Sequence, residues 1–93
     1  MVVASARIRL YAPWVHSLKE KRMEVKSIIA RVRSRFNISA AEVGEQDIHQ
    51  TIVIGLACVS ESAGIADGVL DRVILFIEDN TGAEITDIQR ETR

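Results

Sequence analysis

The chain has 93 residues, of which 47% are hydrophobic and 4% aromatic, and its formal net charge is −1. This length and hydrophobic content exclude a disordered chain and a second core, so we expect a single domain over residues 1–93. One cysteine, Cys58, excludes an internal disulfide and a cysteine-rich metal site. The N-terminus lacks the basic lead of a signal peptide, and no apolar run reaches the ~20 residues of a membrane-spanning helix. We therefore expect a cytoplasmic protein with no membrane partner.

The first part of the chain predicts a strand followed by a helix. Residues 2–11 alternate between apolar and mixed positions, which is typical of a strand with one buried face. Pro13 ends this strand, because proline cannot donate to a β-ladder. Ser17 then begins a helix: its hydroxyl can accept an N–H, and Glu20 can reach back as in a capping box. Apolar residues recur at helical spacing as far as Asn37 and predict a core-facing helix of about five turns.

Two strands are expected next. Residues 38–43 predict a short strand, and residues 44–47 are polar turn material. Residues 49–60 predict the strongest strand of the chain. Both of its faces are largely apolar, which favours a central position in the sheet.

The last third predicts a second helix and a final strand. Residues 63–79 are helical in pattern, with a buried side that runs from Ile65 to Ile77. Gly82 stops this helix and is free to adopt a left-handed conformation. Residues 83–90 contain Ile85 and Ile88, whose opposite parity predicts a bulge or an edge position.

The order of elements is therefore β-α-β-β-α-β. Two βαβ-type units joined by a hairpin predict an α+β fold, the ferredoxin-like sandwich, with a four-stranded antiparallel sheet and both helices on one face. The other face of the sheet is then left open, and it is one of two places where a partner could bind.

The run from Tyr11 to Arg22, which contains H-S-L-K-E-K-R at a helix start, resembles the YlxP-like family of small bacterial domains of unknown function. The resemblance implies a ferredoxin-like fold, and it implies no established reaction and no catalytic residue. It also implies a genomic neighbourhood of translation initiation and ribosome maturation genes. Trp14 stands where many relatives have glycine. The similarity continues through Arg35–Ser39, Ala41–Val43, Gln46–Asp47 and Phe76–Glu78.

The residue pattern offers no catalytic centre. The loop of residues 12–16 has neither the glycine nor the arginine of an acylphosphatase-like phosphate cradle, and it lacks the paired thiols of a soft-metal carrier. His16 and His49 have no ligand spacing, so we expect no metal site. Because no nucleophile–base pair is present, we expect a non-enzymatic protein without a cofactor.

The first helix carries the leading functional hypothesis, which is contact with RNA or a ribosome-associated factor. Residues 17–36 hold seven basic and two acidic side chains, and four of the basic ones fall within an arc of about 60° at helical spacing. An aromatic ring and an imidazole precede the helix and could stack on bases. A merely solvated, charged face is the alternative interpretation. The candidate nucleic-acid-binding residues are Lys19, Arg22, Lys26, Arg33, Trp14 and His16.

The second hypothesis is a protein-interaction module that forms a homodimer through the open sheet face. Exposed apolar patches commonly mark subunit interfaces, and sheet-to-sheet association would bury this one. The candidate interface residues are Val3, Val53, Ala57 and Val59.

Overall fold

A computed structural model describes all residues from 1 to 93 and confirms the predicted order of elements. Each predicted element lies within about two residues of an observed one, which is the usual uncertainty of helix and strand ends. The elements are β1 (Val2–Tyr11), α1 (Leu18–Arg35), β2 (Ser39–Gly44), β3 (Thr51–Ser60), α2 (Ala63–Asn80) and β4 (Glu84–Thr92).

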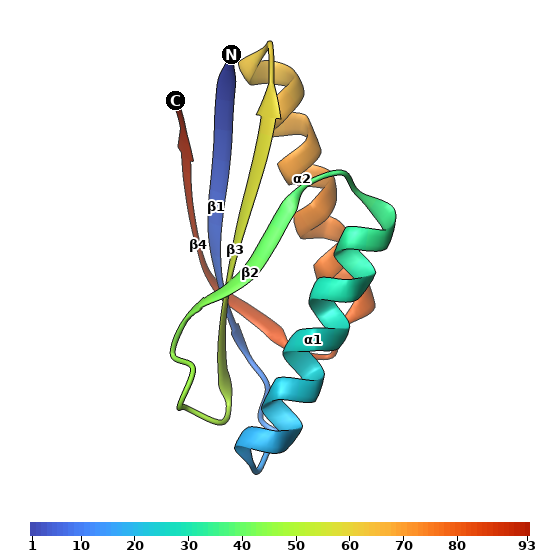
Figure 1. The fold of residues 1–93 in the computed structure, drawn as a ribbon. Helices are drawn as coiled ribbons and strands as arrows, with labels where there is room; N and C mark the ends of the chain where they lie inside the picture. The colour runs from blue at the N-terminus through green and yellow to red at the C-terminus, as the bar shows by residue number, and fades with distance from the viewer.

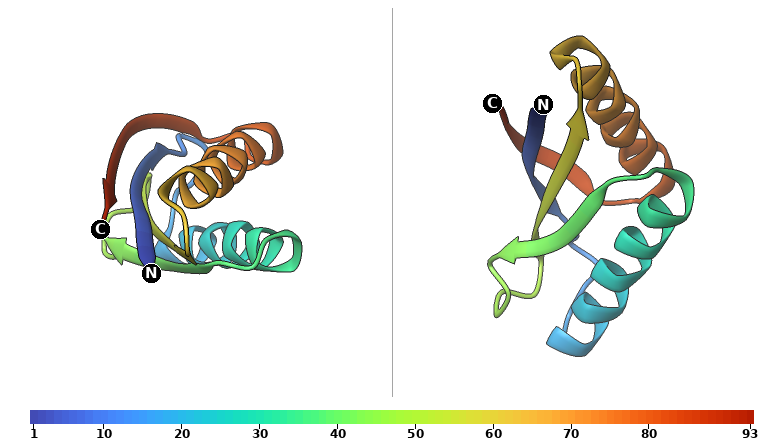
Figure 2. Two further views of the ribbon diagram at one scale, coloured as in Figure 1. Left: turned by 90° about the horizontal axis from the view of Figure 1, so that it is seen from above. Right: turned by 45° about the horizontal axis from the view of Figure 1, so that its top comes forward.

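The four strands form one antiparallel sheet in the order β2-β3-β1-β4 (Figure 1). The two longest strands are central, and Ile8 of β1 pairs with Ile54 of β3 on one side and Ile88 of β4 on the other. Both helices cover the same side of the sheet, as the left view of Figure 2 shows. The fold is therefore the ferredoxin-like α+β sandwich, with β2 and β4 as edge strands.

A register shift in β4 accounts for its irregular apolar pattern. Arg9 of β1 pairs with Asp87, but the next residue of β1, Leu10, pairs with Ile85, so Thr86 is an extra residue on β4. The shift brings Ile85 and Ile88 to the same side of the sheet, where they pair with buried residues of β1. The predicted bulge and edge position are both confirmed.

The N-terminus of α1 is capped as the sequence predicts. The Ser17 hydroxyl accepts from the Glu20 N–H at 3.1 Å, and Glu20 Oε2 accepts from the His16 N–H at 3.3 Å. The reciprocal bond thus reaches one residue further back than in the standard capping box. The Glu20 carboxylate therefore accepts a hydrogen bond from the backbone directly before the helix.

The prediction of a left-handed Gly82 is wrong. No glycine has a positive φ, and Thr81, the residue that follows α2, is extended with φ −136°. Gly82 instead lies under the Trp14 ring, since a Cβ on this glycine would lie 3.4 Å from Trp14 Cη2. The one residue with a positive φ is Glu45, at 53°, in the β2–β3 turn.

The prediction that Ile65 is buried is also wrong, because its exposed fraction is 56%. Ile65 lies on the same flank of α2 as Phe76, which packs edge-on against Phe36 of α1 with the ring centroids 5.6 Å apart. The first turns of α2 extend past the C-terminal end of α1 (Figure 1), so α1 does not cover Ile65.

One charged side chain, Lys21 of α1, is buried, with an exposed fraction of 1%. Its Nζ donates to the main-chain oxygen of Glu45 and lies 3.3 Å from Glu42 Oε2. That carboxylate oxygen is itself buried and has no hydrogen-bond partner, so its contact with Lys21 is an ion pair outside hydrogen-bond geometry. Lys21 therefore connects α1 to the end of β2 and to the turn that follows it.

Replacing Lys21 with methionine tests this connection. We expect Lys21→Met to lower the free energy of unfolding by about 3 kcal/mol, because the largely buried Glu42 carboxylate loses its cationic neighbour. The double variant Lys21→Met/Glu42→Leu should recover most of that loss, since neither buried charge remains. Urea denaturation measures both values.

The control is Lys19→Met, at an exposed position, for which we expect a change below about 0.5 kcal/mol. A Lys21→Met protein as stable as the wild type would show that the buried ion pair does not hold the helix.

Candidate functional site

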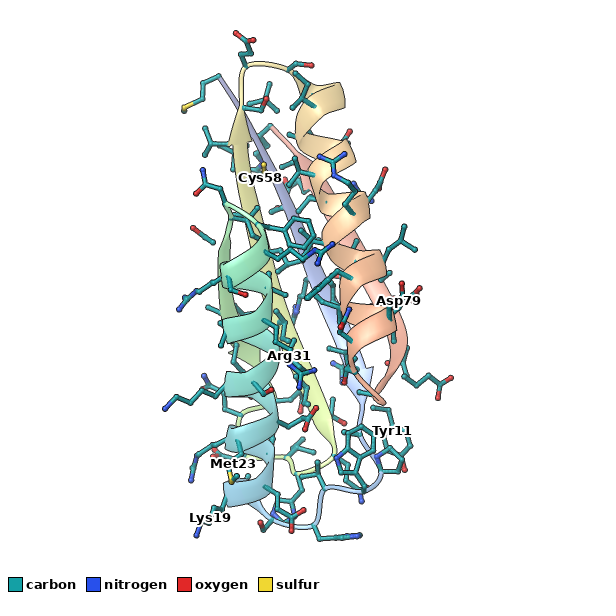
Figure 3. The ribbon with its side chains drawn as sticks, turned by 90° about the vertical axis from the view of Figure 1, so that its right-hand side faces the viewer. Tyr11, Lys19, Met23, Arg31, Cys58 and Asp79 are labelled. Atoms are coloured by element: carbon teal, nitrogen blue, oxygen red, sulfur yellow. The ribbon has the colours of Figure 1, made fainter.

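The exposed flank of α1 carries three basic side chains, Lys19, Arg22 and Lys26, which we call the cationic flank. None of them takes part in any ion pair of the protein. In Figure 3, Lys19 projects outward from the N-terminal end of α1. By contrast, Arg90 on the edge strand β4 is neutralised by Asp71 at 2.5 Å. The cationic flank is thus a set of charges that the protein leaves available to solvent.

The fourth predicted member, Arg33, differs from the other three. Its Nη2 donates to the main-chain oxygen of Ala40 at 2.7 Å, so its guanidinium lies at the edge of β2. Arg33 therefore belongs to the boundary between α1 and the sheet, and it shares only its sign of charge with the cationic flank.

The structure does not bring the Trp14 ring onto the cationic flank. Trp14 is 41% exposed and packs on Gly82, in the connection between α2 and β4. His16 is exposed directly before the helix, but its main-chain N–H donates to the carboxylate of Glu20. An anion approaching this helix end would meet that carboxylate, so the flank rather than the helix N-terminus is the candidate anion-binding surface.

An open groove of about 400 Å³ runs between α1 and the edge strand β2. Its cationic residues are Arg22, Lys26 and Arg33. Its apolar lining is Val25, Ile29, Ala30, Ala40 and Ala41. The groove therefore combines an apolar floor with cationic sides.

A second depression, of about 770 Å³, lies on the open side of the sheet. Small residues at its centre, including Ser5, Gly55 and Ala57, leave the sheet surface low. Val43 of β2 leans across Gly55, where a Cβ would lie only 2.8 Å from Val43 Cγ1. Only glycine fits this position without displacing Val43.

The prediction that Val53 forms part of an exposed apolar interface is wrong, because its exposed fraction is 1%. Val53 is on the open side of the sheet, but Arg7, Arg9, Asp87 and Gln89 line a small space over it. These longer side chains cover the valine and leave it inaccessible to a partner.

The other predicted interface residues keep some exposure. Val3 is 36% exposed and Val59 is 65% exposed, and the two are direct cross-strand partners at one end of the sheet. Ala57 is half-buried in the 770 Å³ depression. Because Val53 is covered, the exposed valines of the predicted apolar patch are Val3 and Val59, at one end of the sheet.

Sequence reasoning missed Lys21, which the structure places among the buried residues. The signal was present in the spacing, because Lys21 lies three residues after Leu18 and four before Val25 on the apolar side of α1. No group of three or more histidine, cysteine or carboxylate residues could hold a metal ion. Neither helix has the length and apolar content needed to cross a bilayer.

The same truncation at two positions of β3 tests the covering of Val53. Val53→Ala should lower the free energy of unfolding by about 2 kcal/mol, because buried methyl groups are lost and a cavity remains. Val59→Ala, on the same face of the same strand, should change it by less than about 0.5 kcal/mol. Equal losses in urea denaturation would contradict the difference in burial.

Comparison with known proteins gives a family and a fold. A family model described as "Protein of unknown function (DUF503)" matches residues 3–90. "Uncharacterized protein YlxP" of Bacillus subtilis (strain 168) is 45% identical over 62 residues, which are 67% of this chain and 67% of that protein. The structure of "De novo designed protein Foldit4" is similar with a TM-score of 0.52 and 14% identity, over 99% of this chain and 94% of that one. This last similarity concerns the fold alone.

The resemblance to the YlxP-like family is therefore confirmed by two independent comparisons, one with a family model and one with a single relative. The matched region contains every helix and nearly every strand residue that positions the cationic flank and the two depressions. The chain belongs to the DUF503 family of proteins of unknown function.

Proposed function

We propose that this chain is a non-enzymatic RNA-binding domain and that the cationic flank of α1 contacts the phosphate backbone. The observation that carries the proposal is the grouping of Lys19, Arg22 and Lys26, all without an ion-pair partner, on one exposed flank of α1. Basic side chains that bind phosphate release condensed counterions, which is the main source of affinity in sequence-independent binding. The cytoplasmic location stays a prediction.

The spacing of the cationic flank suits an extended polyanion. Lys19 and Lys26 are separated by about 10 Å along the helix axis, with Arg22 between them on the same flank. Such a row presents its charges to consecutive phosphates of one strand rather than to a single bound anion. The flank lacks an adjacent aromatic ring, since Trp14 packs on Gly82, which favours backbone contact over base stacking.

The alternative function, self-association through the open sheet face, has weaker support. Val53 is covered by arginine side chains, so the exposed apolar side chains Val3 and Val59 at one end of the sheet are separated from Val43 on the edge strand β2. Stable homodimers usually bury a larger and more continuous apolar surface.

A charge-removal variant tests the RNA proposal. Replacing Lys19, Arg22 and Lys26 with Gln should weaken binding to a fluorescein-labelled RNA hairpin. The magnitude of the negative slope of log affinity against log salt concentration should decrease by about two to three, because up to three phosphate contacts are lost. Fluorescence anisotropy at several salt concentrations measures both quantities.

The matched control replaces Arg35, Arg72 and Arg93 with Gln, which removes the same charge from positions outside the cationic flank. This control should keep the wild-type slope. Equal weakening by the two triple variants, or wild-type protein without salt-dependent binding, would refute the proposal.

A further inference from the structure

Two residues of the edge strand β2 direct their backbone N–H and C=O groups away from the sheet. Ala12 N–H donates to the Gln50 oxygen at 2.8 Å, and pairing between β1 and β3 continues from there without a register shift. Even-numbered residues of β3 therefore direct their backbone groups toward β1 and odd-numbered ones toward β2. Ala40 and Glu42 pair with even-numbered residues of β3, so their N–H and C=O groups face outward.

The Arg33 side chain forms a hydrogen bond with one of these outward backbone groups. The Ala40 oxygen accepts from Arg33 Nη2 at 2.7 Å, where the N–H of a neighbouring strand would otherwise donate. Neither Ala40 N–H nor Glu42 N–H forms one of the backbone bonds that the loops, caps and strand ends supply. The β2 edge thus offers unpaired donors beside an acceptor that a flexible guanidinium covers.

Ala40 is only 3% exposed, with the Arg33 guanidinium on its oxygen, so an added strand must displace that side chain to reach this edge. The 400 Å³ groove on the helix side and the 770 Å³ depression on the open side share Arg33, Ala40 and Ala41 as lining residues. Ala40 and Ala41 present only methyl groups between the two. The side chains of an added strand alternate between faces, so each of the two hollows would take every second residue.

The charge of the helix-side groove determines what kind of strand fits. Arg22, Lys26 and Arg33 surround its apolar floor, so side chains entering it from an added strand meet positive charge. A second copy of this chain, paired edge to edge through β2, would bring two such cationic helices to the same side of the joined sheet. That repulsion disfavours self-pairing and favours a partner with acidic side chains.

We propose that the β2 edge binds an extended, acidic segment of a partner protein as an additional strand. Ala40 and Glu42 supply the main-chain hydrogen bonds, and the acidic side chains at alternate positions pair with Arg22, Lys26 and the released Arg33. This site goes beyond RNA binding and shares Arg22 and Lys26 with it, so the two ligands compete.

The direct test is amide hydrogen exchange measured by NMR on the wild-type protein. The probe is a capped peptide of about eight residues in which Glu and Val alternate, and its control is the block isomer with all Glu residues before all Val residues. Near saturation with the alternating peptide, exchange at the Ala40 and Glu42 amides should slow by at least about tenfold. Binding without this protection, no binding at millimolar peptide, or equal protection by the block isomer would overturn the proposal.

The other edge strand provides an internal control. Val3 exchanges main-chain hydrogen bonds with Arg93 at 2.8 and 2.9 Å, so odd-numbered residues of β1 face β4. Ile88 pairs with the even-numbered Ile8, and its N–H therefore faces outward as that of Ala40 does. The Ile88 amide should keep its exchange rate, because no cationic helix flanks β4; equal protection there would contradict a specific site on β2.

Two variants separate this site from the RNA site. Ala40→Pro removes an outward N–H that the sheet does not use and should abolish peptide binding while leaving RNA affinity unchanged. Lys19→Gln should weaken RNA binding and leave peptide binding unchanged, because Lys19 does not line the groove. Ile88→Pro is the matched proline control, and peptide binding by Ala40→Pro equal to that of Ile88→Pro would overturn the proposal. Should Ala40→Pro fail to fold, the exchange measurement on wild-type protein decides alone.

Discussion

The buried ammonium of Lys21 is the contact on which the position of α1 depends. Its 1% exposure means that the charge must be satisfied by protein atoms, and those atoms come from Glu42 and from the main chain of Glu45. An apolar side chain would tolerate many small displacements of the helix, whereas an ammonium must keep these particular partners. The contact therefore sets the distance between α1 and β2, and with it the groove that lies between them.

The basic residues of the first turns of α1 thus have two different roles, because one points into the protein and the others point to solvent. Lys21 points inward and fixes the helix, while Lys19 and Arg22 on either side of it in the sequence remain unpaired at the surface. The fold itself accommodates many unrelated functions, so the function must depend on these side chains and on the β2 edge. The cationic flank and the β2 edge both depend on α1 holding its place beside the sheet.

Most of the fold could be predicted from periodicity, because burial of one strand face or one helix side leaves a clear apolar pattern. The opposite parity of Ile85 and Ile88 predicted a bulge or an edge position for β4, and the strand has both. The misjudged residues depend on tertiary context. Burial of Lys21 requires partners distant in sequence, Val53 is covered by arginines of a neighbouring strand, and Ile65 is exposed because α1 is too short to reach it. Outward backbone groups on β2 likewise follow from strand order, which no local pattern encodes.

The most direct test of the role of Lys21 is ¹⁵N-detected NMR of the lysine side-chain ammonium groups. We expect one slowly exchanging Nζ signal, assigned to Lys21, with contacts to Glu42 and Glu45, while Lys19 and Lys26 exchange rapidly with water. A Lys21 ammonium that exchanges as fast as the other two would show that it is not held between α1 and β2, and the placement of the helix would then need another cause.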